Sequence, residues 1–352
     1  MITIAWLPGD GVGREVTEGP VALLRELVPG EVELTGPWLI GATGFATTGQ
    51  LLPSDTLQAC QEADAILLGA VGEDRHVGPD VCPRPELSLL GLRRALDLAI
   101  SVREVAVPGG KTVTVVRNLL GGAYVPDDLR QESDGTTPAI DQLILSPELV
   151  TDVAEVACDH VEREPTRRFV SVDKASVYAT SRLWRRVVGD VVARRGLDVE
   201  HVYVDRAAYE LASKPTLPGV VLTEGLFGDI LSDLIAGRAG SPALVGSASL
   251  SPPATSGCRG LFEPAHGSAP HRAGDDVIDP AGGFLALAML LETFPETAGV
   301  ADAVRRGLQD QLNEGPHTYD LAQGLQPIGT AAFSSQVIER VLAHRSSEVA
   351  GA

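Results

Sequence analysis

Short apolar runs rich in β-branched residues alternate along this chain with segments whose apolar positions recur at helical spacing. This alternation is typical of an α/β protein. It predicts strands at residues 2–7, 65–70, 112–119, 168–173, 199–204 and 220–223. It predicts helices at residues 15–27, 89–100, 148–164, 181–195, 284–293, 300–312 and 333–344, and one that starts at 228–229. Residues 124–146, rich in Pro, Asp, Gly, Ser and Thr, are expected to form an arm, and residues 252–260 a loop.

The length and the net charge of the chain indicate how many domains it has and which partners it does not bind. The chain has 352 residues, 44% of them hydrophobic, which is enough for two domains of ~100–200 residues with a buried core. Asp and Glu outnumber Lys and Arg by 47 to 28, so the formal net charge is −19. A surface this acidic repels nucleic acid and anionic membranes, and neither is expected as a partner. An anionic substrate would have to be bound by a local cluster of cations.

The cysteines and the N-terminus favour a cytoplasmic protein. Cys60, Cys82, Cys158 and Cys258 lie far apart without a CxxC pair, which argues against a disulfide framework and a thiolate metal site. The first ten residues lack the basic and apolar regions of a signal peptide. The longest apolar run, residues 284–291, is far shorter than the ~20 residues that a membrane helix needs.

Two aspartates one helical turn apart form the sharpest local signal. Asp229 and Asp233 share one face of the predicted helix, and their charges repel unless a cation lies between them. A hard divalent cation with oxygen ligands, Mg²⁺ or Mn²⁺, would relieve that repulsion. On spacing alone a solvated acidic face is the more frequent explanation, but the flanking residues are apolar, which favours the metal.

Basic residues near strand ends form a second group. Arg93, Arg103 and Arg117 together could hold a dicarboxylate through bidentate hydrogen bonds, although each alone would be read as a surface charge. Lys174 ends an apolar strand, where desolvation and a nearby cation would lower its pKa and suit it to act as a base, unless it simply extends into solvent.

Two glycine-containing loops bear on nucleotide binding. The stiff loop at residues 263–270 has few side chains that would keep a nucleotide away from its backbone amides. The segment at residues 9–13, GDGVG, lacks the spacing and the later acidic residue of a dinucleotide fingerprint, so we do not expect a Rossmann site.

In combination these motifs resemble the β-decarboxylating dehydrogenases, the family of isopropylmalate, isocitrate, homoisocitrate and tartrate dehydrogenases, and most of all its isopropylmalate branch. The resemblance covers nearly the whole chain. It includes GDGVGREV at 9–16, LLGAVG at 67–72, RPELSLLGLRRAL at 84–96, VVRNLLGGAY at 115–124, SVDKASV at 171–177, YVDRAA at 203–208, TEGLFGDILSD at 223–233 and FEPAHGSAP at 262–270. Several motifs in one order are far more specific than any one alone.

The resemblance implies a role for each matching residue. Arg93, Arg103 and Arg117 would bind the substrate carboxylates, Tyr124 would be the general acid, Lys174 the base, and Asp205, Asp229 and Asp233 the ligands of Mg²⁺ or Mn²⁺. Glu86, Leu89 and Leu90 would meet the substrate's 3-substituent, where two leucines favour an apolar group unless they are ordinary core residues. The coenzyme residues would be His266, Gly267, Ser268, Ala269, His271, Arg272 and Asp279.

The resemblance also implies an architecture and a reaction. The expected fold has a large domain from residues 1–98 and 240–352, a small domain from residues 99–239 with the dimer interface and arm, and a non-Rossmann nucleotide site. Lys174 and Asp205 would serve the partner's site in a homodimer. The expected reaction is oxidative decarboxylation of a 3-substituted malate with hydride transfer to NAD⁺ or NADP⁺. The alternatives are a tartrate- or isocitrate-type substrate and a catalytically silent regulatory relative.

Several positions depart from the family's pattern. Ser176, Gly225 and Arg206 each stand where the family usually has Asn, and Asn118 stands where it usually has Glu. These departures point toward a specialised relative. His271 and Arg272 follow HGSAP, where NAD-dependent relatives carry Asp, so the lost anion and the gained cation favour NADP⁺ or a weak coenzyme preference.

Overall fold

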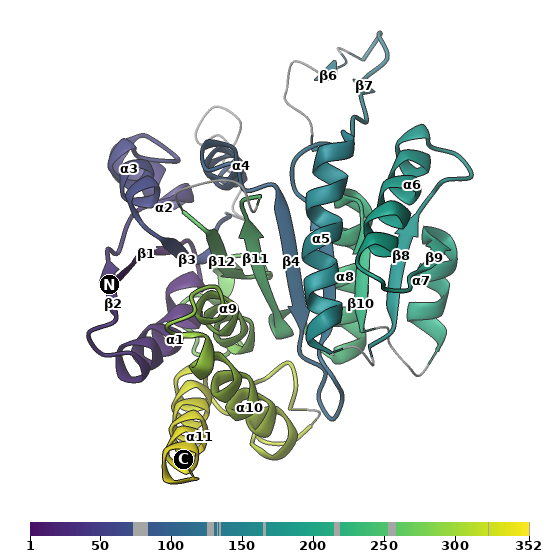
Figure 1. The fold of residues 1–352 in the computed structure, drawn as a ribbon. Helices are drawn as coiled ribbons and strands as arrows, with labels where there is room; N and C mark the ends of the chain where they lie inside the picture. The colour runs from purple at the N-terminus through teal and green to yellow at the C-terminus, as the bar shows by residue number, and fades with distance from the viewer. Residues whose placement is uncertain are drawn as a thin grey trace.

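A single twisted sheet with helices on both faces forms the centre of the molecule (Figure 1). The computed structural model describes residues 1–72, 84–124, 130–131, 133, 135–164, 167–214, 219–252, 258–322 and 324–351. Cys82, most of the predicted loop at 252–260 and parts of the predicted arm lie outside these residues. The α/β fold predicted from the sequence is confirmed.

The sheet combines two parallel halves. Its order is β2 (Val32–Thr35), β1 (Ile2–Gly9), β3 (Ala65–Ala70), β12 (Gly260–Pro264), β11 (Val245–Leu250), β4 (Ile100–Val105), β5 (Val113–Asn118), β10 (Val220–Thr223), β8 (Phe169–Asp173) and β9 (Glu200–Tyr203). The first four strands are mutually parallel, and so are the last four. Antiparallel pairing through β11 and β4 joins the halves, so residues from distant parts of the sequence meet at the middle of the sheet.

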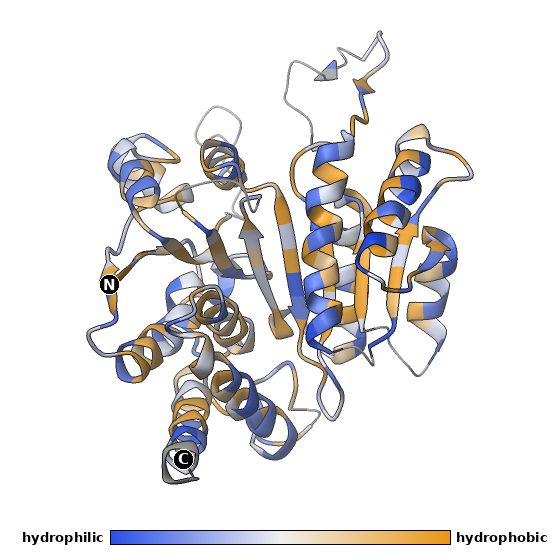
Figure 2. Cartoon of the chain, viewed as in Figure 1, coloured by the Kyte–Doolittle hydropathy of each residue, from blue (hydrophilic) through white to orange (hydrophobic). Residues whose placement is uncertain are grey.

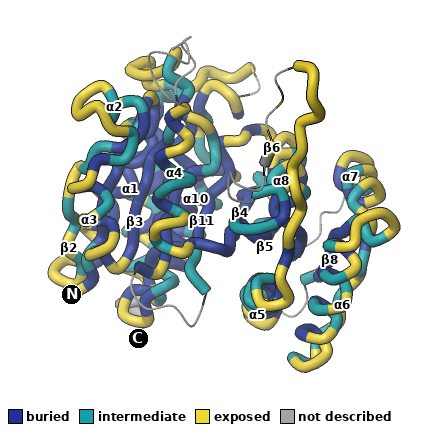
Figure 3. The backbone as a smooth tube through the Cα atoms, turned by 90° about the horizontal axis from the view of Figure 1, so that it is seen from above, coloured by how far each residue is buried: buried dark blue, intermediate teal, exposed yellow. Residues whose placement is uncertain are grey.

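Helices cover both faces of the sheet. They are α1 (Gly13–Leu27), α2 (Gly41–Thr48), α3 (Ser54–Glu62), α4 (Glu86–Ala95), α5 (Pro147–Arg163), α6 (Ala179–Arg194), α7 (Val204–Ser213), α8 (Gly225–Ala239), α9 (Ala281–Glu292), α10 (Ala298–Glu314) and α11 (Thr330–Gly351). In the half that contains β5, β10 and β8, α5 and α6 pack on one face and α7 and α8 on the other (Figure 3).

The most apolar helix lies inside the protein. Residues 281–291 of α9 are all buried between the sheet and the outer helices, whereas the outer side of α10 is mainly hydrophilic (Figure 2). The long apolar run in the sequence is therefore a core helix. No helix in the described part of the chain combines the length and the apolar character that crossing a bilayer requires.

Several element predictions were wrong in detail, and three of them bear on the site. The helix predicted at 89–100 is α4, which ends at Ala95, and Ile100 already belongs to β4. The strand predicted at 199–204 ends at Tyr203, because α7 starts at Val204. The helix predicted to start at 228–229 starts three residues earlier, at Gly225. Strand β11 was not predicted, because its sequence, VGSASL, is small and partly polar.

Strand β4 carries charged side chains on both faces. Arg103 contacts α8, whereas Glu104 pairs with Arg305 of α10 on the opposite side of the sheet, at 3.2 Å. Arg305 also binds Glu292, which pairs with Arg163 at the end of α5. Buried carboxylates and guanidinium groups need such partners, because an unpaired charge is costly away from water.

The arm stands apart from the helices (Figure 1). Its short strands β6 (Arg130–Gln131) and β7 (Ile140–Asp141) pair with each other and not with the main sheet. The exposed apolar residues Ile140, Leu143 and Ile144 lie along it. The predicted division into two domains would separate β11 from β4, which are neighbours in the sheet, and it stays a prediction.

Candidate active site

Polar side chains form a row across the middle of the sheet. Glu263 of β12 lies opposite Ser247 of β11, and Ser247 lies opposite Arg103 of β4. Arg117 of β5 is paired with Ser101, two residues from Arg103. Because alternate residues of a strand face the same side, Glu263, Arg103 and Arg117 all project toward the face that α8 covers.

Two arginines of this row converge on α8. Nη2 of Arg103 lies 3.1 Å from Oδ1 of Asp229, and Nη2 of Arg117 lies 2.9 Å from the same oxygen. Nη1 of Arg103 lies 3.6 Å from Oδ1 of Asp233 and donates a hydrogen bond to Ser232 Oγ at 2.7 Å. The guanidinium group of Arg103 therefore lies between the two aspartates. It is a cation, as the repulsion between their charges requires.

The electrostatics around these arginines favour a further anion. Burial, together with the neighbouring charge of Arg117, lowers the pKa of Arg103. Partial burial raises the pKa of Asp233, and Asp229 adds to this rise while Arg103 opposes it. The buried Nε atoms of Arg93, Arg103 and Arg117 all lack a hydrogen-bond partner among the described residues. The chain's own acceptors therefore leave part of each guanidinium group unsatisfied, and such groups suit carboxylates.

Helix α4 brings Arg93 to the same row. Nη2 of Arg93 lies 2.7 Å from Oε1 of Glu263, so this arginine is held by a carboxylate whose role the sequence did not reveal. Leu89 is half-buried and packs on the core beneath α4, while Leu90 is half-buried without belonging to a core cluster. Glu86 is exposed in the first turn of α4 and lines the neighbouring cavity.

Tyr124 lies next to Arg117. Its hydroxyl accepts a hydrogen bond from Arg117 Nη1 at 3.4 Å, and the guanidinium carbon lies 5.7 Å from the ring centre. Arg117 Nη1 also donates to the backbone oxygen of Gly225 at 2.9 Å. Because the Tyr124 hydroxyl accepts this hydrogen bond, its own O–H can still be donated to another acceptor.

Lys174 and Asp205 form a separate pair. Nζ of Lys174 lies 2.6 Å from Oδ1 of Asp205, and the hydrogen bond lowers the pKa of this exposed aspartate. Among the described residues, no group of three or more His, Cys, Asp or Glu side chains gathers where it could hold a metal ion. One chain thus supplies two neighbouring carboxylates on α8, and Asp205 lies with Lys174 instead.

A cavity of about 490 Å³ lies against the loop that follows β12. Its walls include Gly72, Ser241, Asp320 and the predicted coenzyme residues His266, Gly267, Ser268, Ala269 and His271. Burial lowers the pKa of His266, whose Nδ1 contacts the backbone oxygen of Gly267 and whose Nε2 has no partner among the described residues. An unsatisfied buried nitrogen and a glycine-containing loop fit a ligand that is held largely by backbone groups.

The other two predicted coenzyme residues, Arg272 and Asp279, follow lining residues in the sequence but do not themselves line this cavity. Arg272 is exposed, and its guanidinium carbon lies 6.0 Å from the ring centre of Tyr319. Asp279 is fully buried, and burial raises its pKa to about 7. The Thr318 hydroxyl lies 2.7 Å from Oδ2 of Asp279 and 2.9 Å from Oδ1 of Asp320. Because one hydroxyl carries one proton, both contacts are hydrogen bonds only when one carboxyl group is protonated.

The GDGVG loop supports this cavity. The carboxylate of Asp10 accepts hydrogen bonds from the amides of Ala42, Thr43 and Gly72. Gly11 has a φ of 53°, and a Cβ atom there would lie 2.0 Å from the backbone oxygen of Ser268. The loop is therefore packed directly against the HGSAP loop. The sequence of the GDGVG segment did not predict this supporting role.

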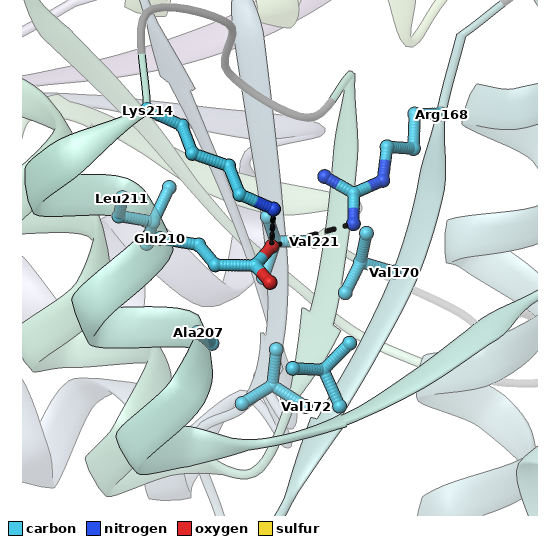
Figure 4. Close-up of a pocket in the computed structure, with 9 residues that line it drawn as sticks. Arg168, Val170, Val172, Ala207, Glu210, Leu211, Lys214 and Val221 are labelled. Atoms are coloured by element: carbon cyan, nitrogen blue, oxygen red, sulfur yellow. Dashed lines mark ion pairs between the residues drawn. The ribbon is translucent and has the colours of Figure 1, made fainter.

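A second pocket is too small for a substrate. It lies between α7 and strands β8 and β10, has valines on its floor, and measures about 20 Å³, which is room for about one water molecule (Figure 4). Glu210 closes it through ion pairs with Lys214 at 3.0 Å and Arg168 at 3.6 Å. None of the predicted site residues lines it.

The fold and this arrangement of charged residues define a class, the decarboxylating hydroxyacid dehydrogenases. A family model described as isocitrate/isopropylmalate dehydrogenase matches residues 3–339. The chain belongs to this family, whose members carry out oxidative decarboxylation of hydroxyacids.

Relatives of known function agree with this assignment. The 3-isopropylmalate dehydrogenase of Salinibacter ruber is 39% identical, over 96% of this chain and 94% of the relative. The corresponding enzyme of Nitratidesulfovibrio vulgaris is 38% identical, over 97% and 99%. Among solved structures, a β-decarboxylating dehydrogenase from Thermococcus kodakarensis has a TM-score of 0.80 at 28% identity, with 98% of both chains covered. Isocitrate dehydrogenase from Methylococcus capsulatus has a TM-score of 0.82 at 25% identity, with 97% and 99% covered.

Proposed function

We propose that this chain oxidises and decarboxylates a 3-substituted malate, most simply one with an alkyl group like that of 3-isopropylmalate, with a divalent metal and NADP⁺ or NAD⁺. The convergence of Arg103 and Arg117 on Asp229 carries the proposal. It brings a buried and a largely buried cation, which suit substrate carboxylates, next to two carboxylates that suit a hard cation. The 3-isopropylmalate dehydrogenases among its relatives support the choice of substrate.

The proposal assigns a role to each polar residue of the site. Arg93, Arg103 and Arg117 bind and orient the substrate carboxylates. Lys174 accepts the proton of the substrate hydroxyl, and Tyr124 returns a proton to the carbon that has lost carbon dioxide. When bound, Mg²⁺ or Mn²⁺ supplies a Lewis acid and the coenzyme supplies the hydride acceptor. Asp229 and Asp233, with Asp205 from a second copy, would hold the metal.

A homodimer with shared sites would complete this set. Lys174 and Asp205 lie together on an accessible surface, so one chain could deliver both to its partner. Exposed apolar residues adjoin both halves of the site: Val177, Tyr178, Tyr203, Leu226 and Ile230. Large apolar groups that gather on a surface are typical of a protein interface.

Exposed basic residues at the coenzyme cavity favour NADP⁺. His271 lines the cavity and stands directly after HGSAP, where NAD-dependent relatives would carry an aspartate, and Arg272 follows it. A guanidinium group binds a phosphate well, and the lost carboxylate would have repelled one.

A substrate panel tests the proposal. Malates with different 3-substituents are assayed with both coenzymes and with Mg²⁺ or Mn²⁺, measuring reduced coenzyme and released carbon dioxide. We expect equal amounts of both products with an alkyl-substituted malate, and loss of turnover with a chelator. Reduced coenzyme without carbon dioxide would instead indicate tartrate-type chemistry, and no turnover of any malate would refute the proposal.

A further inference from the structure

The predicted proton donor, Tyr124, is packed against a glycine. A Cβ atom at Gly225 would lie 2.8 Å from both Cδ2 and Cε2 of Tyr124 and 2.7 Å from the backbone oxygen of Asn118. Real Cβ atoms essentially never approach other atoms this closely. The ring therefore occupies space that any other residue at the start of α8 would fill.

Gly225 also contacts the arginine beside the phenol. Its backbone oxygen accepts a hydrogen bond from Arg117 Nη1 at 2.9 Å, and the same nitrogen donates to the Tyr124 hydroxyl at 3.4 Å. The ring packs on one side of Gly225, and the hydroxyl lies on the arginine that Gly225 holds. A displacement of the ring at Gly225 would separate the hydroxyl from this arginine.

Asn118 ties Gly225 to the turn that leads to Tyr124. Its Oδ1 accepts a hydrogen bond from the Gly225 amide at 2.8 Å, and its Nδ2 donates to the backbone oxygens of Leu120 at 2.9 Å and Gly121 at 3.3 Å. The Gly225 amide is at the start of α8 and has no partner inside the helix, and the preceding Glu224 side chain does not cap it. Asn118 is fully buried, so its amide has no water to replace these partners.

Only an amide side chain can make this set of bonds. It offers an acceptor to an N–H group and a donor to two carbonyl oxygens, whereas a carboxylate offers acceptors alone. Asn118 and Gly225 are two of the positions at which the resemblance implies a different residue, and here they are hydrogen-bonded to each other, while Gly225 packs against Tyr124.

We infer that Asn118 and Gly225 act as one pair of positioning residues that hold the Tyr124 phenol against Arg117, an inference that rests on the proposed role of Tyr124 as proton donor. Gly225 makes room for the ring, and Asn118 fixes both the start of α8 and the turn before the ring. Neither residue transfers a proton. Their substitution should act through the Tyr124 hydroxyl.

A double-mutant cycle tests this dependence. Gly225→Ala, Tyr124→Phe and the double variant are compared, with Gly237→Ala as the control, because a Cβ atom at Gly237 of the same helix meets nothing within 4 Å. We expect kcat to fall roughly 10²-fold or more in Tyr124→Phe, as for loss of a general acid. Gly225→Ala should lower kcat strongly in the native background and hardly further in the Tyr124→Phe background. The inference would be overturned if Gly225→Ala lowered kcat by the same factor in both backgrounds, or if it did not change kcat at all.

A second measurement does not depend on activity. With ¹³C at the tyrosine Cζ atoms, the Tyr124 signal is assigned from its absence in Tyr124→Phe. Gly225→Ala and Asn118→Asp should each shift this signal and Gly237→Ala should not, and an unshifted signal in both test variants would refute the inference. If the native enzyme turns over no substrate in the panel, the proposed function fails while the signal still decides the position of the ring. Asn118→Asp also supplies the kinetic test if Gly225→Ala does not fold.

Discussion

Nη2 of Arg117 lies 2.9 Å from Oδ1 of Asp229, and the Arg117 side chain is only 5% exposed. A nearly buried guanidinium group thus depends on a carboxylate that solvent can still reach, since the Asp229 side chain is 41% exposed. A carboxylate in this position neutralises the arginines when the site is empty and remains available to a cation.

Asp229→Asn should therefore have two effects. The free energy of unfolding should fall by about 1–3 kcal/mol, because Arg103 and Arg117 lose a charged partner. Turnover should fall roughly 10²–10³-fold, because the site loses preorganised charge and one carboxylate for the metal. Denaturant unfolding and steady-state kinetics across a series of Mn²⁺ concentrations measure both. Asp190→Asn, at an exposed position of α6, is the control, and an active Asp229→Asn enzyme would contradict the assignment.

Shared sites predict recovery of activity in mixed dimers. Lys174→Ala and Asp233→Asn should each be inactive alone, because each removes one half of every site. In a randomly reassorted mixture about half of the dimers carry one intact site, so about a quarter of the native activity should return. Differently tagged chains allow the mixed dimer to be purified and assayed. An inactive mixed dimer would show that Lys174 and Asp233 do not come from different chains.

Asp279 should make stability depend on pH. Burial raises its pKa from the usual 3.8 to about 7. Between these values the folded protein binds a proton that the unfolded chain has lost, so stability from this group falls as the pH rises from about 4 to about 7. Asp279→Asn mimics the protonated carboxyl and keeps a donor for the Thr318 hydroxyl. The midpoint temperature of thermal unfolding should fall less between pH 5 and pH 8 in this variant than in the native protein. Parallel curves of midpoint against pH would contradict the prediction.

Arg272 should affect the choice of coenzyme. If its guanidinium group binds a 2′-phosphate, Arg272→Ala should weaken the binding of NADP⁺ about tenfold and leave the binding of NAD⁺ nearly unchanged. Isothermal titration with each coenzyme measures this ratio. Arg186→Ala, which removes an exposed charge from α6, controls for net charge. Equal weakening of both coenzymes would assign Arg272 a structural role instead.

Local patterns predicted most elements but missed the centre of the sheet. Strand β10 was predicted at its observed bounds, because VVLT is an uninterrupted apolar run. Strand β4 was missed, because Arg103 and Glu104 place charges on both of its faces and remove the apolar pattern. Both charges are satisfied by partners far away in the sequence, Asp229 for Arg103 and Arg305 for Glu104, which no local window includes.

The predicted site shows the same limit. The motifs identified Arg103, Arg117 and Asp229, which the fold brings into contact. They did not reveal that Glu263 holds Arg93 or that Asn118 binds Gly225, because these pairs are 170 and 107 residues apart. The type of a residue predicts the chemistry that its side chain can perform. The contacts across the sheet decide which residue becomes its partner.

The alternation of Arg103 and Glu104 along β4 has a mechanical consequence. A shift of this strand large enough to bring Arg103 closer to a substrate also pulls on the Glu104–Arg305 pair behind the sheet. The proposed substrate contact of Arg103 and the ionic contacts of α10 are thus linked through a single peptide bond. A substitution at the Glu104–Arg305 pair, on the face of the sheet away from the proposed site, would therefore alter the affinity for a ligand bound by Arg103.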